Sequence, residues 1–425
     1  MTPTPSPPIS TEWTGYHRDA GRSGLGPAEP GLGTPTVAWR VGFDGDVYAS
    51  PLIVNGHVIV ATENNTVYSL DLFTGEQVWK THLGDPVSSS SLPCGDIGPV
   101  TGITGTPVAD ESLNRLYVVG FVSGLHHMLF ALSLTDGSLS WQRPVDPVGS
   151  VASVQQQRGA LAIGSGYVYV PLGGLYGDCG AYRGYVVGIS LDGAAAVAYV
   201  VPTARGAGIW SSAGVSVGSE GSVYVVSGNA TSSASTFGYS DSVLQLSPDL
   251  SSLRSYFAPS NWAALNASDT DLGSVGATLL SSGLVVSIGK EGVAYVLRAG
   301  ALGGVGGSLA SRHVCAGAWG GTSWMDSVVF VPCIDGLYAL NVSSTSVSVL
   351  WRAPHPSLGS PIVSAGAVWA IEPSSGTLYA LDMASGAVRF STSVGAAEHF
   401  STPAATDGFV VAPAGRNVVA LSVVS

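Results

Sequence analysis

The chain ends with His399-Phe-Ser-Thr-Pro-Ala through Asn417-Val-Val-Ala-Leu-Ser, a repeat of three strand-like runs where every other repeat has four. An orphan strand, Thr36-Val-Ala-Trp39-Arg-Val, stands near the other end. A ring of four-stranded sheets can close by pairing such an N-terminal strand into the last sheet, which leaves only short, protected edges. The sequence therefore predicts an all-β propeller of four-stranded antiparallel blades, closed by Thr36 to Val41.

Each repeat follows one pattern. A small residue, often before Pro, opens an apolar run; a Gly-containing turn leads to a second run; then Tyr-x-Leu-Asp, a turn and a strand ending in an aromatic follow. The clearest copies run from Ser50 to Trp79 and from Ser360 to Phe390. Such openings recur at Ser50, Thr106, Gly159, Ser212, Gly276, Thr322, Ser360 and Thr402. We predict eight blades in one domain over residues 34–425, after a linker and lead-in segment over residues 1–33.

The long insertions between strands gather on one face. Naming the strands A to D from hub to rim places every long insertion between D and the next A, or between B and C. Those connections emerge on the same side because strand direction alternates within a blade. The insertions are residues 84–104, 144–157, 173–183, 203–209, 229–240, 258–274 and 312–320. Loops held by a rigid scaffold carry function, so we expect the functional site on this long-loop face.

The amino-acid composition limits the kinds of partner that this protein can bind. The net charge is −12, and Lys80 and Lys290 are the only lysines, which argues against binding to nucleic acid or to an anionic membrane. No apolar run approaches the about 20 residues of a membrane-spanning helix. The Pro-rich start, residues 1–10, reads as a linker behind a removed signal or lipoprotein anchor. We expect a monomer that is secreted, periplasmic or held at the cell surface.

The four cysteines support export. Cys315 and Cys333 fall at the entry and at the B–C turn of one blade, and Cys94 and Cys179 fall in loops of the same face. We predict the disulfides Cys315–Cys333 and Cys94–Cys179. Four unpaired buried thiols are the alternative, and no cysteine spacing suits zinc.

These residues carry a family resemblance. Tyr-x-Leu-Asp-x-x-Thr-Gly-x-x-x-Trp resembles the tryptophan-docking repeat of the pyrroloquinoline quinone (PQQ)-like propellers, which include quinoprotein alcohol dehydrogenases and the outer-membrane assembly propeller. Over nearly the whole chain the likeness is to secreted PQQ-like repeat proteins near polyvinyl alcohol dehydrogenase. It rests on Trp13-Thr-Gly-Tyr16-His-Arg-Asp-Ala-Gly-Arg-Ser-Gly24, Gly102-Ile-Thr-Gly-Thr-Pro107, Gly208-Ile-Trp210-Ser-Ser-Ala-Gly, Asp269-Thr-Asp271-Leu-Gly-Ser and Gly289-Lys290-Glu-Gly-Val-Ala-Tyr-Val-Leu297.

The chain also departs from the dehydrogenases in that group. They typically carry adjacent cysteines over the quinone, a Trp platform beneath it, a Glu/Asn/Asp set for calcium and an Asp base. This chain has no adjacent cysteines and no Cys-x-x-Cys-His for haem. Lys290 resembles the family's basic residue that reaches the quinone oxygens. The resemblance thus implies PQQ with calcium as a possible cofactor, without a complete set of residues for it.

Large polar and aromatic residues precede the A strands, where they would line the mouth of the central channel. The candidate ligand-binding residues are Tyr48, Gln156, Arg158, Trp210, Asp271, Lys290, Trp319, Trp324 and His399. Converging polar groups with aromatic walls are typical of a ligand pocket. The structural alternative is that Arg158 pairs with Asp271 across the channel and that the tryptophans pack between blades. We expect Lys290 either to pair with Asp271 or to receive an anionic group.

Two further patterns have structural explanations that outweigh their functional ones. His126 and His127 begin a C strand and should point to opposite faces, so a shared metal site is not expected. Asn266-Ala-Ser-Asp269-Thr-Asp271 offers oxygen ligands of the calcium type, but lacks an EF-hand arrangement.

Three classes of function remain. The first is an exported propeller that binds a small molecule, glycan or protein on its long-loop face; the incomplete catalytic sets favour it. The second is a PQQ-dependent alcohol or sugar dehydrogenase, and the third is a cofactor-free enzyme at the channel mouth. The propeller fold alone does not choose among them, because function lies in sites carried by folds.

Overall fold

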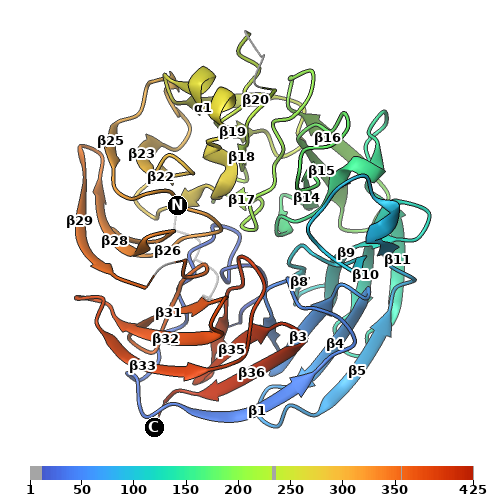
Figure 1. The fold of residues 1–425 in the computed structure, drawn as a ribbon. Helices are drawn as coiled ribbons and strands as arrows, with labels where there is room; N and C mark the ends of the chain where they lie inside the picture. Colours follow the sequence, from blue (N-terminus) through green and yellow to red (C-terminus); the bar gives the residue numbers. More distant parts are fainter. Residues whose placement is uncertain (1–11, 232–235, 356, 425) are drawn as a thin grey trace, which may run out of the picture.

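Eight antiparallel sheets surround a central axis in the computed structural model, which describes residues 12–231, 236–355 and 357–424 (Figure 1). We number the blades by their innermost strand in chain order. Blade 1 holds β2 (Leu52–Val54), β3 (His57–Thr62), β4 (Thr66–Asp71) and β5 (Gln77–His82). Blade 2 holds β8 (Val108–Asp110), β9 (Arg115–Val122), β10 (His126–Ser133) and β11 (Leu139–Pro144).

Blades 3 and 4 each carry a short additional strand. Blade 3 holds β12 (Gln155–Gln156), β13 (Ala162–Gly164), β14 (Tyr167–Gly174), β15 (Tyr185–Ser190) and β16 (Ala196–Val200). Blade 4 holds β17 (Ser216–Val217), β18 (Val223–Ser227), β19 (Ser242–Leu246), β20 (Leu253–Ala258) and β24 (Gly304–Val305). A separate two-stranded ribbon, β6 (Val87–Ser88) with β7 (Val100–Thr101), lies in the loop between blades 1 and 2.

The second half of the ring is more regular. Blade 5 holds β21 (Thr278–Leu279), β22 (Leu284–Ser287), β23 (Val293–Arg298) and β25 (Ala310–His313). Blade 6 holds β26 (Ser323–Met325), β27 (Val328–Cys333), β28 (Gly336–Ser343) and β29 (Ser346–Ala353). Blade 7 holds β30 (Ile362–Ser364), β31 (Ala367–Glu372), β32 (Thr377–Asp382) and β33 (Val388–Ser393).

Blade 8 contains both ends of the chain. Its strands are β34 (Ala404–Thr406), β35 (Phe409–Ala414), β36 (Asn417–Ser422) and the N-terminal β1 (Thr36–Gly42). The blue strand β1 lies beside the red strand β36 in Figure 1, and Trp39 pairs with Ala420 across them. The predicted closure and the eight-bladed count are confirmed.

A tryptophan on the outer strand joins each of several blades to the next one. The Trp39 indole donates to the carbonyl of Leu72 at 2.8 Å, and its ring lies against Gly75, where a Cβ atom would come within 2.8 Å of it. Gly75 also has φ +74°, a conformation that glycine adopts at little cost. Trp79 with Gly137 and Trp351 with Gly386 repeat this contact. This explains the Thr-Gly and Trp positions of the repeat.

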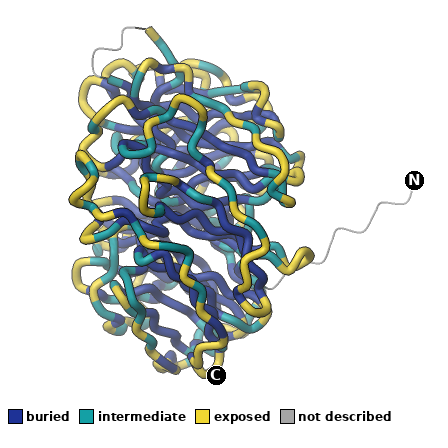
Figure 2. Tube along the Cα trace, turned by 90° about the vertical axis from the view of Figure 1, so that its right-hand side faces the viewer, coloured by how far each residue is buried: buried dark blue, intermediate teal, exposed yellow. Residues whose placement is uncertain are grey.

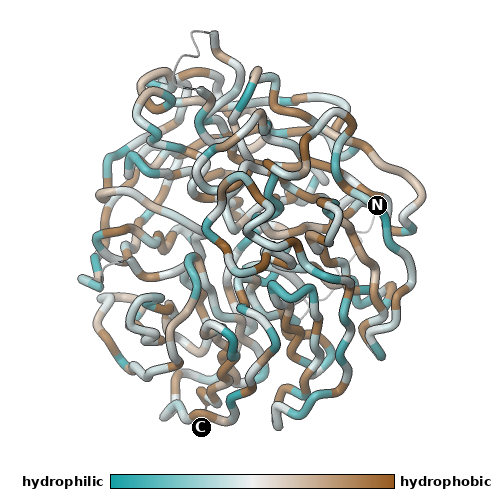
Figure 3. Tube along the Cα trace, turned by 45° about the vertical axis from the view of Figure 1, so that its right-hand side comes forward, coloured by the Kyte–Doolittle hydropathy of each residue, from teal (hydrophilic) through white to brown (hydrophobic). Residues whose placement is uncertain are grey.

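Burial follows the position of a strand in its blade. The middle strands are covered on both faces by neighbouring blades, so β14 and β18 read as nearly continuous buried runs. Outer strands such as β5 leave most side chains exposed at the rim. Figure 2 shows buried strands inside and exposed loops outside, and Figure 3 shows hydrophobic and hydrophilic segments alternating along the chain.

The segment before β1 is packed inside the ring. Trp13, Tyr16 and His17 are at most 1% exposed. The segment hydrogen-bonds to the innermost strands through the backbone amides of Ile53, Ala109, Val217, Trp324 and Val363. These bonds satisfy donors on strand edges that would otherwise lack partners. The described part of the lead-in segment therefore plugs the channel.

Most insertions lie where the sequence analysis put them, between D and A strands or between B and C strands. One carries the short helix α1 (Trp262–Ser268). Residues 299–309, between β23 and β25, are a further insertion on the opposite face that the sequence analysis did not count. They are rich in glycine and read as a turn, but β24 within them pairs with β20 of blade 4. Within the described ranges, no helix is long and apolar enough to cross a membrane.

The contact between Trp39 and Gly75 predicts that a methyl group added at Gly75 lowers the free energy of unfolding more than one added at a turn glycine without such a contact. Gly75→Ala should destabilise the protein by about 1–3 kcal/mol more than Gly56→Ala, because the new Cβ must push against Trp39. Gly56 has a similar φ of +72° and open space around it, so it controls for the backbone cost. Chemical denaturation of both variants checks this, and equal losses would contradict the docking role.

Candidate functional site

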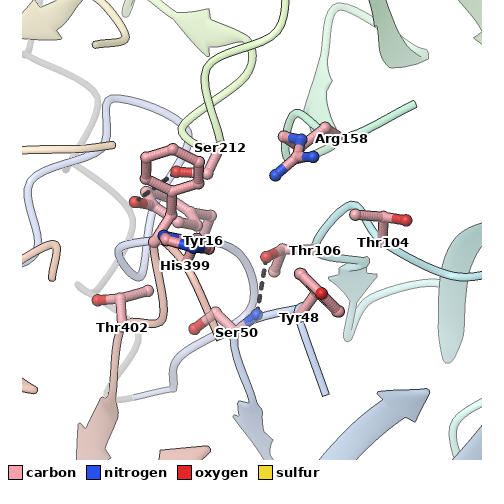
Figure 4. Close-up of a pocket in the computed structure, with 10 residues that line it drawn as sticks. Tyr16, Tyr48, Ser50, Thr104, Thr106, Arg158, Ser212, His399 and Thr402 are labelled. Atoms are coloured by element: carbon pink, nitrogen blue, oxygen red, sulfur yellow. Dashed lines mark hydrogen bonds between the residues drawn. The ribbon is translucent and has the colours of Figure 1, made fainter. Parts of the chain in front are cut away.

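A small hollow lies at the channel mouth on the long-loop face, just above the plug. Its volume is about 10 Å³, which is room for about one water molecule. Tyr16 of the plug contributes to its wall, and Arg158 and His399 approach it from different sides (Figure 4). The other lining residues are Tyr48, Ser50, Thr104, Thr106, Ser212, Phe400 and Thr402. We call this space the mouth hollow.

Arg158 is held in place at the mouth hollow. Its Nη2 donates to Asp96 Oδ1 at 2.8 Å, and its guanidinium lies 5.8 Å from the centre of the Phe400 ring. Arg158 therefore pairs with Asp96, and the alternative of an Arg158–Asp271 pair is wrong. Asp96 and Arg158 are 62 residues apart in the sequence, so no local pattern reveals that they pair.

Glu63 is a buried acid next to the mouth that the sequence analysis missed. Its Oε2 accepts from the backbone of Gly102 at 2.6 Å, and Oε1 has no hydrogen-bond partner in the described part of the chain. Burial raises the pKa of Glu63 to about 7, although the backbone hydrogen bond from Gly102 and the charge of Arg158 act to lower it. A Thr-Glu-Asn-Asn turn between two apolar runs was its only signal.

Lys290 is enclosed by acids beside the mouth. Its Nζ lies 2.6 Å from Asp271 Oδ2 and 3.2 Å from Asp269 Oδ1, and 5.6 Å from the centre of the Trp210 ring. The first of the two expectations for Lys290, a pair with Asp271, is thus realised. Burial raises the pKa of Asp271, and the positive charge of Lys290 offsets only part of this rise. A second buried acid, Asp241, has its pKa raised to about 8 by burial.

A larger, mostly apolar hollow adjoins the mouth over blades 6 to 8. It measures about 640 Å³. Its apolar surface comes from Trp319, Pro332, Ile334, Leu358, Pro373 and Phe400. His399 lines both this hollow and the mouth hollow. Phe400 has φ +66°, a strained value for a bulky residue. We call this space the apolar hollow.

Five candidates from the sequence line neither hollow: Trp210, Asp271 and Lys290, which lie together beside the mouth, and Gln156 and Trp324. Gln156, in β12, is buried and faces a narrow seam beside Thr104 and His127. Trp324, in β26, packs against the core between blades 5 and 6. The sequence analysis missed Phe400 and Tyr16, because a plug running through the ring has no signature in local sequence.

The remaining predictions can be compared directly with the structure. Cys94–Cys179 and Cys315–Cys333 are both bonded, as predicted. His126 is exposed whereas His127 is buried and lies 2.7 Å from Asp146, so the two rings point apart as expected. In the Asn266 to Asp271 segment, Lys290 Nζ contacts both acids where a calcium ion would need them.

Comparison with known proteins agrees with this architecture. The family model described as outer membrane protein assembly factor BamB matches residues 34–286 and 338–425. The chain belongs to this PQQ-like propeller family. The XoxF protein of Paracoccus denitrificans, which carries a dehydrogenase name, is 32% identical over 96 residues, 23% of this chain and 14% of that protein. The chain thus spans about a seventh of the length of that curated relative.

Solved structures of the PQQ-like propeller family share the fold. Quinohemoprotein alcohol dehydrogenase ADHIIG from Pseudomonas putida HK5 superimposes with a TM-score of 0.78 at 13% identity, covering 97% of this chain and 80% of that one. BamB from Moraxella catarrhalis gives 0.63 at 14% identity, covering 92% and 98%. One of these structures is named as an alcohol dehydrogenase and the other as BamB, so the shared fold leaves function open.

Glu63 makes stability depend on pH. The folded protein keeps a proton on this carboxyl between about pH 4.5 and 7, which the unfolded chain releases. Its contribution is therefore full below about pH 4.5 and is lost as pH rises through about 7, at up to about 1.4 kcal/mol per pH unit. Glu63→Gln should make the decline shallower in denaturation curves measured from pH 4 to 8, and the part that remains is the share of Asp241. The exposed Glu76→Gln is the control; parallel profiles for Glu63→Gln and wild type would refute the assignment.

Substitutions of Lys290 and Lys80 form a matched pair that tests how much the ion pairs of Lys290 contribute to stability. Lys290→Ala leaves the carboxylate of Asp271, 3% exposed, without its cation and should cost about 3 kcal/mol. Lys80→Ala breaks an exposed pair, 3.5 Å from Asp44, and should cost at most about 1 kcal/mol. Thermal and chemical denaturation measure both. Equal stability of the two variants would contradict a structural role for Lys290.

Proposed function

We propose that this protein is a ligand-binding propeller whose ligand is a small, mainly apolar molecule held on the long-loop face beside the channel mouth. The observation that carries the proposal is the apolar hollow of about 640 Å³, within the size range of small-molecule pockets. Two rings, Trp319 and Phe400, offer flat surfaces for such a molecule. His399 supplies one polar group at the inner border.

The arrangement of the ring supports a small ligand over a protein partner at this place. The apolar hollow is bounded by loops of three blades, and the plug closes the channel beneath the mouth. A concave, preformed space of this kind encloses a small molecule and presents little flat surface to a protein. Two disulfides in the loops of this face fit a protein that folds in an oxidising compartment. We therefore propose that the chain acts outside the cytoplasm.

A PQQ-dependent dehydrogenase is the second candidate, and Lys290 beside Trp210 is the observation in its favour. The residues present do not fit the cofactor well. PQQ is a rigid tricycle with three carboxylates, whereas the mouth hollow has room for about one water molecule. Among the described residues that line the apolar hollow there is no lysine or arginine. Lys290 Nζ already lies between two carboxylates. These facts favour binding over quinone-dependent oxidation.

A neutral fluorescent probe tests the binding proposal. N-phenyl-1-naphthylamine brightens in apolar surroundings, and we expect saturable binding at one site per chain. Trp319→Ala should weaken this binding by about tenfold, through lost ring contact. Phe73→Ala removes an exposed ring from the opposite face and should change nothing. Absence of saturable binding, or equal binding by Trp319→Ala, would refute the proposal.

The two candidates separate in a second experiment. Purified protein is mixed with PQQ and Ca²⁺, and absorbance and dye reduction are measured with a panel of alcohols. We expect no absorbance shift and no dye reduction. Alcohol-dependent dye reduction that Lys290→Ala abolishes would overturn this expectation and favour the dehydrogenase.

A further inference from the structure

A third cavity, the polar cleft, lies on the same face over blades 3 to 5. None of its described lining residues is shared with the two hollows at the mouth. It measures about 550 Å³. The side chains that matter are Asp178, Tyr182, Arg205, Asn229, Asn266 and Asp269. They come from four separate insertions, so only the folded ring brings them together.

One wall of the polar cleft is fixed by hydrogen bonds and a disulfide. Tyr182 donates its hydroxyl hydrogen to Asp178 Oδ1, and Arg205 donates to the carbonyls of Asp178 and Gly180. Cys94–Cys179 ties the adjacent residue to another loop. The exposed carboxylate of Asp178 is thus held in one orientation with unused lone pairs, which is preorganisation for a ligand.

The other wall is equally constrained. Asn229 Nδ2 donates to Asp269 Oδ1 at 3.3 Å, and Asp269 also accepts from Lys290. Asn266 Oδ1 accepts from the backbone of Ala230 at 2.7 Å. Asn266 is 2% exposed, and its Nδ2 has no hydrogen-bond partner among the residues the structure describes. A buried amide donor without a partner is costly, and a ligand oxygen would satisfy it.

The charges in the polar cleft select the chemical class of the ligand. Two carboxylates line the cleft, and a guanidinium and an ammonium lie beside them, so neither a strong anion nor a strong cation is favoured. The groups that line the cleft are two amides, two carboxylates and a guanidinium, planar groups that accept or donate hydrogen bonds in pairs. Neighbouring hydroxyl groups match such pairs, because each hydroxyl donates and accepts at once.

We propose that the polar cleft binds a neutral polyhydroxylated ligand, a saccharide of one to three units, with Asp178 and Asp269 accepting from its hydroxyls and Asn229 beside them. The volume suits this size class. The site is independent of the apolar hollow, so each can fail without the other.

Binding of defined sugars tests the proposal. Maltose, cellobiose and N-acetylglucosamine are offered separately, and saturation-transfer NMR and calorimetry detect binding. At least one should bind, and Asp178→Ala should weaken it about tenfold or more, as expected for a lost hydrogen bond to a charged group. Asp249→Ala, an exposed acid in a turn of the opposite face, is the matched control. Thermal denaturation verifies that both variants fold.

Other probes distinguish competing explanations. Putrescine and inorganic phosphate are tested in the same way; binding of either one without any sugar would overturn the proposal in favour of a charge site. Failure of all three sugars would also overturn it. Trp319→Ala should leave sugar binding unchanged, and a loss of sugar binding in that variant would show that the sugar occupies the apolar hollow instead.

Discussion

Docking of an outer-strand tryptophan onto a turn glycine of the next blade is the contact on which this ring depends. The indole donates to a backbone carbonyl and packs where no Cβ atom is present, and the glycine-containing turn between the third and fourth strands of the next blade supplies both. Trp39 makes the contact decisive, because it belongs to β1 of blade 8 but docks on blade 1. The same strand therefore completes the last sheet and fastens it to the first one.

The plug gives the two faces of the ring different roles. Innermost strands of a propeller carry backbone donors that face the channel, and the lead-in segment satisfies many of them by crossing from blade to blade. Polar groups buried this deeply must be neutral or hydrogen-bonded. Burial lowers the pKa of His17 to about 3, and Arg22 donates hydrogen bonds to the carbonyls of Tyr16 and Leu161. With the channel filled by the lead-in segment, the cavities of about 550 and 640 Å³ lie among the loops of the long-loop face.

That face is divided by polarity. At its centre, Arg158 and Lys290 are matched with acids, so the charges that could meet an anionic cofactor are committed within the protein. The apolar hollow lies on one side over blades 6 to 8 and the polar cleft on the other over blades 3 to 5. The loops, which the ring leaves free to vary, give one scaffold two kinds of surface.

The sequence by itself predicted the eight blades, the closing strand and both disulfides. Repeat period and turn glycines are local signals. The missing fourth strand of the last repeat identified the partner of Thr36 to Val41, and Cys94 and Cys179, 85 residues apart, were matched because both fall in loops of one face. It also predicted the face from which the seven long insertions emerge, because strand direction alternates within a blade. Only the tertiary structure decided which side chains meet. Asp96 pairs with Arg158, Phe400 lines the mouth hollow, and residues 13–24 lie inside the channel. These contacts join distant segments of the chain, and their energies depend on burial and distance that no local pattern encodes.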